Sequence, residues 1–448
     1  MDIKSEEYTI NRISVNHPVF LCGLAAVFCM FTTNCILESM TLTDLYLLFV
    51  GFGFVVGWIM WEKPWQTTLT ALVAGMVSML MATVVNYDMV LSIGGIALLI
   101  MAVFILHYKG RLDPLHAMVL LFILGFYIRL CYVLYTNLGQ REDLYFTPDM
   151  TGFSLYYLLT GLIKRGYTLF KPYMDGNLEV VQIVNFFFAN IASIGIYKIL
   201  RGFGFKGNNL TIVTLLISTF PLFAFQAGGW SESTMSVSLA VWALYYGFKW
   251  YRTLSYRFFA GAVLCILLGL GASPAALTAV PVLLILIIKT MSSSRVKAGK
   301  GVLFMLMLII CSVPFPVLFY MYNGLRIDGF FVDFSLFGMF ETLSFAIAGL
   351  LFIIALWGAA VADGKRALKA ENLAFAMLIA GACGYAFIFG DWSVLVPALI
   401  PLSVYASFLL EKGLIRSAIA AVFAFCALVS VLLCDFVWII DRGIQAGV

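Results

Sequence analysis

Residues 120–138 read LLFILGFYIRLCYVLYTNL, an apolar run in which Arg129 is the only charged side chain. The run is close to the roughly 20 residues that an α-helix needs to cross a bilayer. Similar runs recur from one end of the 448-residue chain to the other, and 63% of the residues are hydrophobic. Soluble domains are roughly half apolar, and the strands of a membrane β-barrel would alternate over about ten residues. The sequence therefore predicts an all-α, polytopic helical membrane protein.

The apolar runs predict about 13–15 transmembrane helices. The expected spans are 17–37, 43–61, 66–86, 89–107, 114–136, 179–200, 208–225, 233–250, 257–271, 274–290, 301–321, 338–360, 371–390, 393–410 and 415–438. The polar N-terminus precedes an apolar run without a small-residue cleavage site, which indicates a retained signal-anchor. We expect three segments: about four helices in 1–113, a core in 114–290 and C-terminal helices in 291–448.

Lys and Arg are distributed unevenly over the connections between these runs. With a cytoplasmic N-terminus, 20 of the 27 basic residues fall on the cytoplasmic side, as the positive-inside rule requires. We therefore expect a multi-pass protein of a bacterial plasma (inner) membrane, with its N-terminus in the cytoplasm. The acids in the remaining connections then face the external side of the membrane, where neither ATP nor a nucleotide sugar is expected.

The longest external connection, 137–178, is well beyond the usual loop length and is therefore more typical of a functional loop than of a spacer. Its start, GQREDLYFTPD (139–149), contains Arg141, Glu142, Asp143 and Asp149. A carboxylate at a membrane boundary is partly desolvated, which raises its basicity and suits it to take a proton from an attacking hydroxyl. The alternative is a solvated pair of loop acids, with Arg141 as a salt-bridge neighbour.

The same connection continues with MTGFSLYYLLTGLIKRG (150–166). Phe153, Tyr156, Tyr157 and Leu159 recur near Leu162 and Ile163 at helical spacing, and Lys164 and Arg165 follow them. This pattern predicts an amphipathic helix that lies in the membrane interface without crossing the bilayer.

A second acidic feature is the short external turn in FQAGGWSESTMSV (225–237), where Glu232 lies between two apolar runs. Glu232 is a candidate for a site residue. The alternative is ordinary helix capping by Ser231, Ser233 and Glu232, because Ser and Glu favour first turns.

Two arginines are further candidates. Arg129, inside a span, is costly unless it pairs with an acid, binds a lipid phosphate or reaches the interface. Arg326, in the external YNGLRIDGFFVDF (322–334), could meet a phosphate or be ordinary loop charge.

Several classes of site are not indicated. The three histidines lie far apart, the nine cysteines include no C-x-x-C pair, and no P-loop, G-x-S-x-G or H-E-x-x-H pattern is present. The sequence predicts no metal site and no soluble basic domain for nucleic acid. A divalent cation such as Mg²⁺ or Mn²⁺ could assist external acids, although no ligand spacing demands one.

From about residue 114 to 290, the order of features resembles the GT-C glycosyltransferases, membrane enzymes that use polyprenyl-phosphate sugars. An arginine-bearing helix ends in TNLGQREDLY (136–145), and an amphipathic segment, an acidic external turn and a small-residue helix pair follow. WSES (230–233) is similar to the YSES or YTES motif of GPI-type mannosyltransferases. The late segment FGDWSVLVPALIP (389–401) resembles the family's RY-x-x-P helix, but has Asp391 and Trp392 where an arginine is usual.

The resemblance implies transfer of a sugar from a polyprenyl-phosphate donor to a lipid-linked or cell-envelope acceptor at the external face, among membrane lipids. Asp143 or Glu142 is then expected as the catalytic base, with Asp149 in reserve, and Glu232 as a second acid that orients the acceptor or the donor sugar. The departing phosphate is already charged and needs cations more than a proton. The candidates for binding it are Arg129, Lys164, Arg165 and Arg326, and Arg141 is a further candidate for substrate binding.

Two other functions remain open. A polysaccharide polymerase or ligase of the O-antigen kind also has many spans and one large external loop, but relies on arginine-rich loops. The external arginines expected here are Arg141, Arg165, Arg326 and Arg442. A transporter or flippase would use acids near the middle of the bilayer, whereas the expected external acids lie at span ends and in loops.

Overall fold

The computed structural model describes residues 154–170, 179–205, 231–323, 370–389 and 391–413, with the single positions 210, 213, 217 and 220. The chain divides into two compact units, Met1–Tyr127 and Ile128–Val448, and all described residues belong to the second. The predicted spans before 179, most of 208–225, and the spans 338–360 and 415–438 lie outside the described residues. Every regular element in the described ranges is a helix.

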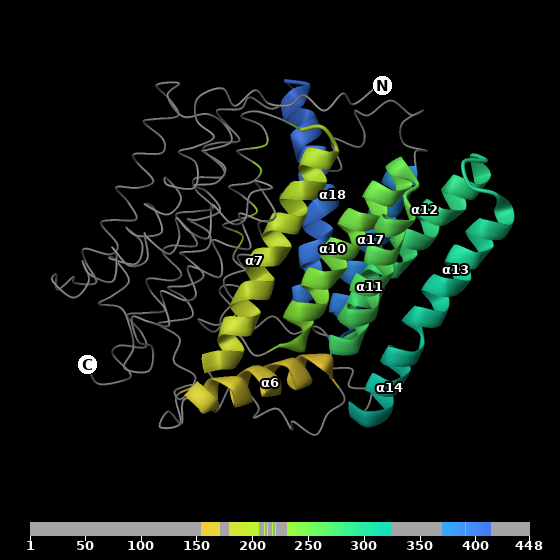
Figure 1. Ribbon diagram of the computed structural model, residues 1–448. Coiled ribbons are helices and arrows are strands. Elements are labelled where there is room, and N and C mark those ends of the chain that lie inside the picture. The colour runs from red at the N-terminus through yellow and green to blue at the C-terminus, as the bar shows by residue number, and fades with distance from the viewer. Residues whose placement is uncertain are drawn as a thin grey trace, which may run out of the picture. The chain divides into compact units, whose positions relative to one another are not determined.

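The described helices lie at the predicted runs, although some ends differ (Figure 1). The elements are α6 (Leu155–Phe170), α7 (Glu179–Gly202), α10 (Glu232–Thr253), α11 (Tyr256–Ala272), the 3₁₀ helix η3 (Pro274–Ala279), α12 (Val280–Ser292), α13 (Ala298–Ser312), α14 (Pro314–Asn323), α17 (Ala370–Phe389), the 3₁₀ helix η4 (Trp392–Val394) and α18 (Leu395–Glu411). Three continuous helical stretches are long and apolar enough to cross a membrane, namely Pro274–Ser292, Ala298–Met321 and Asn372–Phe389. This part of the chain is therefore all-α and has the composition of a helical membrane protein.

The chain reverses direction at GASP, between α11 and η3. Ser273 adopts an extended conformation (φ −157°, ψ 153°), and its hydroxyl accepts a hydrogen bond from the Ala275 amide at 3.4 Å. Pro274 occupies the first helical position, where its missing N–H would have no intrahelical partner in any case. This capped turn starts η3, which continues into α12 at Val280.

The predicted single run 301–321 is divided in the structure into α13 and α14. The division falls at Pro314, which has no amide hydrogen to donate to the preceding turn and whose ring crowds that turn. The amide of Val313 still donates to the Ile309 carbonyl at 3.1 Å, so the chain keeps a helical course through the break. The stretch Ala298–Met321 therefore remains one candidate membrane span.

Helix α10 lies at the centre of the described helices and packs against α7, α11, α12, η3 and α18. Two glycines permit close approach. A Cβ atom on Gly247 would lie 2.3 Å from Cδ2 of Leu283 on α12, and one on Gly195 of α7 would lie 2.8 Å from Cγ1 of Val241. Small residues at helix crossings are typical of membrane proteins, because they let the backbones pack closely. The position of α10 is consequently fixed on two sides.

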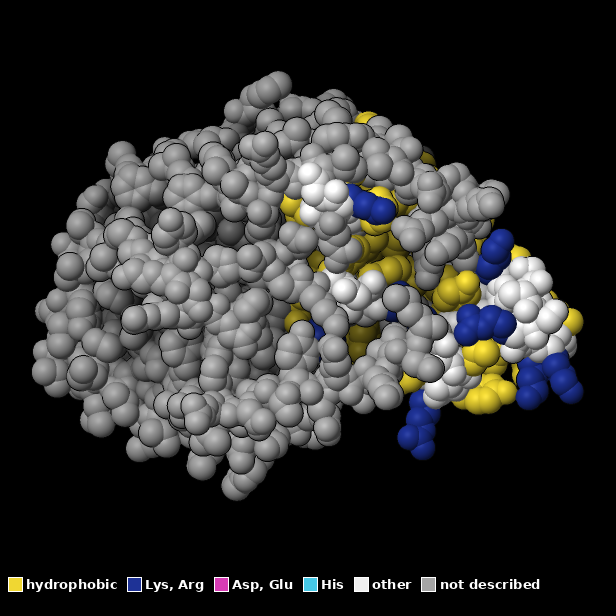
Figure 2. All heavy atoms as spheres, turned by 90° about the horizontal axis from the view of Figure 1, so that it is seen from above, with side chains coloured by type: hydrophobic (Ala, Val, Ile, Leu, Met, Phe, Trp, Pro, Cys, Tyr) yellow, Lys and Arg dark blue, Asp and Glu magenta, His cyan; other side chains and the backbone are white. Residues whose placement is uncertain are grey.

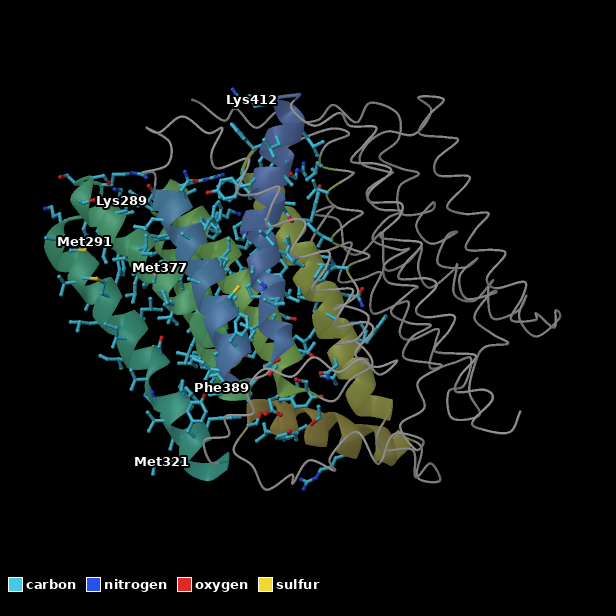
Figure 3. The ribbon with its side chains drawn as sticks, turned by 180° about the vertical axis from the view of Figure 1, so that it is seen from behind. Lys289, Met291, Met321, Met377, Phe389 and Lys412 are labelled. Carbon is cyan, nitrogen blue, oxygen red and sulfur yellow. The ribbon has the colours of Figure 1, made fainter. Side chains whose placement is uncertain are left out.

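Most of the described cations lie at one end of these helices, and the described acids lie at the other end together with Arg165 of α6. We define the basic end by the described cations Lys198, Arg201, Lys249, Arg252, Arg257, Lys289, Arg295, Lys297, Lys300 and Lys412. Figure 3 shows Lys289 and Lys412 at this end, with Met321 and Phe389 at the opposite one. Figure 2 looks onto the basic end, where described Lys and Arg side chains are visible and no described Asp or Glu side chain is. We define the acidic end by Glu232 at the start of α10 and Asp391 before η4.

Candidate functional site

Helix α6 runs across the acidic end, transverse to the longer helices (Figure 1). The hydroxyl of Ser154 donates to the Ala272 carbonyl at 2.7 Å, which fixes the start of α6 to the end of α11. Tyr156 is fully buried against a cluster that includes Met235 and Ala272. The helix predicted over 150–166 is therefore present, with one face anchored to α7, α10 and α11.

The opposite face of α6 is apolar and exposed. Leu158 and Leu162, one helical turn apart, are 61% and 57% exposed, and Arg165 is exposed on the same side. An apolar face that ends in a cation is typical of a helix at the boundary between lipid and water.

One hydrogen bond joins α6 to the start of α10. The Tyr157 hydroxyl donates to Oε2 of Glu232 at 2.5 Å, a length typical of a hydrogen bond between a hydroxyl and a charged carboxylate. The expected capping is present as well, because Ser231 is the N-cap residue and its hydroxyl accepts from the Ser233 amide at 3.2 Å. Ser231 therefore performs the capping, and the Glu232 carboxylate binds Tyr157.

The surroundings of Glu232 make its carboxyl group harder to ionise than that of a solvated glutamate. Burial raises the pKa of the Glu232 carboxyl above its ordinary value, the hydrogen bond from Tyr157 opposes this increase, and the nearby charge of Asp391 adds to it. Burial also raises the pKa of Tyr157 far above its ordinary value, so this tyrosine stays a neutral donor. Glu232 thus accepts a proton more readily than a solvated glutamate does, a property common at functional sites.

Tyr385 of α17 and Asp391, which precedes η4, extend this arrangement. Oδ1 of Asp391 accepts from the amide of Ser393 at 3.0 Å and from its hydroxyl at 2.5 Å. The charge of Asp391 acts on both Glu232 and Tyr385. We name Tyr157, Glu232, Tyr385 and Asp391 the tyrosine–carboxylate cluster. Helices α6, α10 and α17 and the residue before η4 thus bring two acids and two phenol hydroxyls to one end of the helices.

The cluster lies next to the α11–η3 turn. Tyr385 interacts with Ser273 of this turn and with Tyr320 of α14, and the Ser273 carbonyl accepts from Ser236 of α10 at 2.8 Å. The helix η3 that the capped GASP turn starts therefore packs against both α10 and α17.

The structure describes three of the residues predicted for the site. Glu232 belongs to the cluster, Arg165 lies on the exposed face of α6, and the backbone of Lys164 lies in α6. The other predicted site residues, Arg129, Arg141, Glu142, Asp143, Asp149 and Arg326, lie outside the described residues. Among the described residues, no group of three or more His, Cys, Asp or Glu could hold a metal ion.

Sequence reasoning missed the partners of Glu232. It placed Tyr157 among the apolar residues of a helix face, passed over Tyr385 inside a run, and noted Asp391 as a departure from an expected arginine. Asp391 did have a local signal, because an acid two residues before a serine at the start of an apolar run is typical of a capping turn. Tyr157 had none, because its partner is 75 positions away along the chain.

No model of a known protein family matches this sequence. A comparison with well-characterised proteins also finds no significant match.

Proposed function

We propose that the protein is a GT-C-like membrane glycosyltransferase that moves a sugar from a polyprenyl-phosphate donor to a lipid-linked or envelope acceptor. The observation that carries this proposal is the partly buried Glu232 carboxylate, hydrogen-bonded to Tyr157 of α6. A carboxylate beneath a transverse amphipathic helix suits a reaction in which one substrate is held in lipid and the other comes from water.

The chemistry needs a base, a positioned hydroxyl and a stabilised leaving group. The acceptor hydroxyl gives its proton to a carboxylate, its oxygen bonds to the anomeric carbon, and the bond from that carbon to the phosphate oxygen breaks. The phosphate leaves with the electron pair and is stabilised by cations. By the family resemblance, Asp143 or Glu142 is the base, and Glu232 orients a sugar hydroxyl.

The charge distribution supports an external site. The positive-inside rule places the basic end in the cytoplasm, which puts the tyrosine–carboxylate cluster at the outer face of a plasma membrane, with the N-terminus cytoplasmic. Lipid-linked sugars are suitable donors at that face, because nucleotide sugars are confined to the cytoplasm.

The positions of the described acids favour an enzyme over a transporter. Glu232 is the first residue of α10, and Asp391 precedes η4. Coupling residues of a transporter are expected near the middle of the bilayer, and both of these acids lie at helix ends. A polymerase or ligase of the O-antigen kind remains an alternative that the donor panel below distinguishes.

The test is transfer from a panel of radiolabelled polyprenyl-phosphate sugars to a membrane lipid extract by the purified protein. We expect one donor to be used, and we expect Glu232→Gln, Asp143→Asn or Glu142→Gln to reduce transfer while the donor still binds. Extension of a lipid-linked oligosaccharide in place of transfer from a monosaccharide donor would favour the polymerase. Movement of labelled lipid across a sealed vesicle without any transfer would favour the transporter.

A further inference from the structure

A second surface lies at the basic end, where α11 and α13 begin side by side. Tyr256 and Arg257 open α11, Lys297 precedes α13, and Lys300 lies in its first turn. All four side chains are exposed. The Lys300 ammonium donates to the Tyr256 hydroxyl at 3.2 Å. We name these four residues the α11–α13 basic patch.

Buried aromatic packing holds the two helix starts together beneath this patch. The ring of Phe304 on α13 lies 4.4 Å from that of Phe259 on α11 and 5.8 Å from that of Tyr256, measured between centroids. It also packs edge-on against Trp250 of α10 at 5.6 Å. The spacing of the patch is therefore set by packed rings and does not depend on flexible loop residues alone.

The same two helices carry an exposed apolar strip next to the patch. Leu264 of α11 is 56% exposed, and Leu303 and Ile310 of α13 are 62% and 66% exposed. The strip belongs to the candidate span Ala298–Met321 and to the shorter apolar helix Tyr256–Ala272. Along both helices, then, exposed cations give way to exposed aliphatic side chains.

The described charged side chains of this surface are all cations. In the described ranges, the acids whose side chains are placed are Glu232 and Asp391, and both lie at the acidic end. Figure 2 shows the described cations of the basic end next to yellow apolar side chains, over the region of α12 and α13. A ligand that matches both features has an anionic head and an apolar tail.

We propose that the α11–α13 basic patch binds an anionic phospholipid. Arg257, Lys297 and Lys300 hold its phosphate, and the Tyr256 hydroxyl, which accepts from Lys300, donates its own hydrogen to a phosphate oxygen. The acyl chains lie along Leu264, Leu303 and Ile310. Basic residues near a membrane surface each add to the attraction for anionic lipid, and Arg presents a planar fork that suits phosphate oxygens. This inference does not depend on the proposed glycosyltransferase activity.

A lipid is favoured over a soluble phosphate because the apolar strip adjoins the cations. A soluble phosphate compound would use the cations and leave the aliphatic side chains without a role. The two sources can be separated by adding inorganic phosphate in place of lipid.

The test compares lipid retention by the full-length protein, reconstituted in nanodiscs that contain equal amounts of phosphatidylglycerol and phosphatidylcholine. Native mass spectrometry after detergent release measures which lipid stays bound. We expect phosphatidylglycerol to be retained in preference, and the double variant Arg257→Gln/Lys300→Gln to lose most of that preference, roughly fivefold for each basic residue removed. Lys412→Gln is the matched control, an exposed cation of the same end on another helix, and is expected to retain the preference.

Three outcomes would overturn the proposal. These are equal retention of the two lipids by the parent protein, an equal loss in Lys412→Gln, or displacement of phosphatidylglycerol by millimolar inorganic phosphate. The second measurement is thermal unfolding in detergent with either lipid added. It tests the proposal even if the double variant cannot be reconstituted in nanodiscs. Phosphatidylglycerol is expected to raise the midpoint of the parent protein more than phosphatidylcholine does. An equal shift with both lipids would also overturn the proposal.

Discussion

The acidic end and the basic end of the described helices treat charge in opposite ways. At the acidic end, the Glu232 carboxylate is partly buried and accepts a hydrogen bond from the Tyr157 hydroxyl of another helix. At the basic end, Arg295 is exposed and donates to the backbone carbonyls of Tyr251 and Arg252 at 3.0 and 3.2 Å. Burying a charge is costly unless it is compensated, whereas exposed cations cost little.

This difference separates a site from an orientation signal. The exposed cations of the basic end explain which side of a membrane the helices face, and most need no further role. The partly buried carboxylate is not needed for the stability of α10, because a solvated glutamate at the start of the helix would interact with its dipole equally well. Substitutions at the acidic end should therefore change activity, and those at the basic end should change stability or lipid binding.

The largest effect is expected for Glu232→Gln. The amide keeps the shape but carries no charge and has one acceptor oxygen fewer, so the sugar hydroxyl that Glu232 orients loses a charged partner and we expect sugar transfer to fall by about 10²-fold. Lys412→Gln, a charge change at the basic end, should leave transfer within about twofold, since an exposed side chain there is remote from the reaction. Rates of transfer from saturating donor measure both. Equal losses in the two variants would remove the distinction between the ends.

A smaller effect is expected for Tyr157→Phe, which removes the hydroxyl and keeps the ring. A hydrogen bond to a charged group is worth about 1.5–3 kcal/mol, so we expect transfer to fall by about tenfold or more. The bond from Tyr157 lowers the pKa of Glu232, so its loss should raise that pKa further. Transfer depends on the ionised form of Glu232. As the pH is lowered, Tyr157→Phe should therefore lose activity at a higher pH than the parent protein does.

The pH–rate profile separates this role from simple anchoring of α6. Ser154→Ala also loosens α6, because it removes the bond to the Ala272 carbonyl, but it does not touch Glu232. A shift of the acid limb in Tyr157→Phe and none in Ser154→Ala is the expected pattern. The same shift in both variants would assign the effect to the helix and not to the hydrogen bond.

The sequence predicted where individual helices lie better than it predicted which helices pack against one another. The runs 179–200, 233–250 and 257–271 appear as α7, α10 and α11, because the length of an apolar run reflects how much helix must be buried in an apolar environment. Helical spacing in 150–166 likewise located α6. The break within 301–321 was missed, although Pro314 signalled it.

The same reasoning could not predict the contacts between helices. In lipid, helices associate through packing and hydrogen bonds that an apolar run does not encode. Gly247 facing Leu283 and Tyr157 facing Glu232 are both pairings of this kind. Glu232 could be selected because a carboxylate between apolar runs is unusual, but its hydrogen-bond partner required the structure.

At the basic end, Arg295→Gln should cost stability alone. Arg295 supplies two hydrogen bonds to carbonyls at the end of α10, where the backbone has no intrahelical donors left. We expect a loss of about 1 kcal/mol or less, since the side chain is exposed. Thermal unfolding in detergent measures this loss, and the transfer rate at a permissive temperature should match that of the parent protein. A reduced rate without a reduced midpoint would show that the basic end takes part in the reaction.

The smallest effect concerns the stability of the acidic end itself. Burial holds the pKa of Glu232 above its ordinary value in the folded protein, so the folded state binds this proton more tightly than the unfolded chain does. The stabilising contribution is full below the ordinary glutamate pKa and decreases as the pH rises through the folded value. Glu232→Gln, which stays neutral, should therefore unfold at a slightly higher temperature than the parent protein at neutral pH.

That difference should shrink as the solution is acidified, because the parent carboxyl then becomes protonated and resembles the amide. Lys412→Gln again serves as the control and should show no such convergence, since the acids whose side chains the structure describes, Glu232 and Asp391, lie at the other end of the helices. If Glu232→Gln were instead less stable than the parent at neutral pH, the ionised carboxylate would be a net stabilising group. The acidic end would then be an ordinary polar contact between α6 and α10, and the contrast between the two ends would lose its functional meaning.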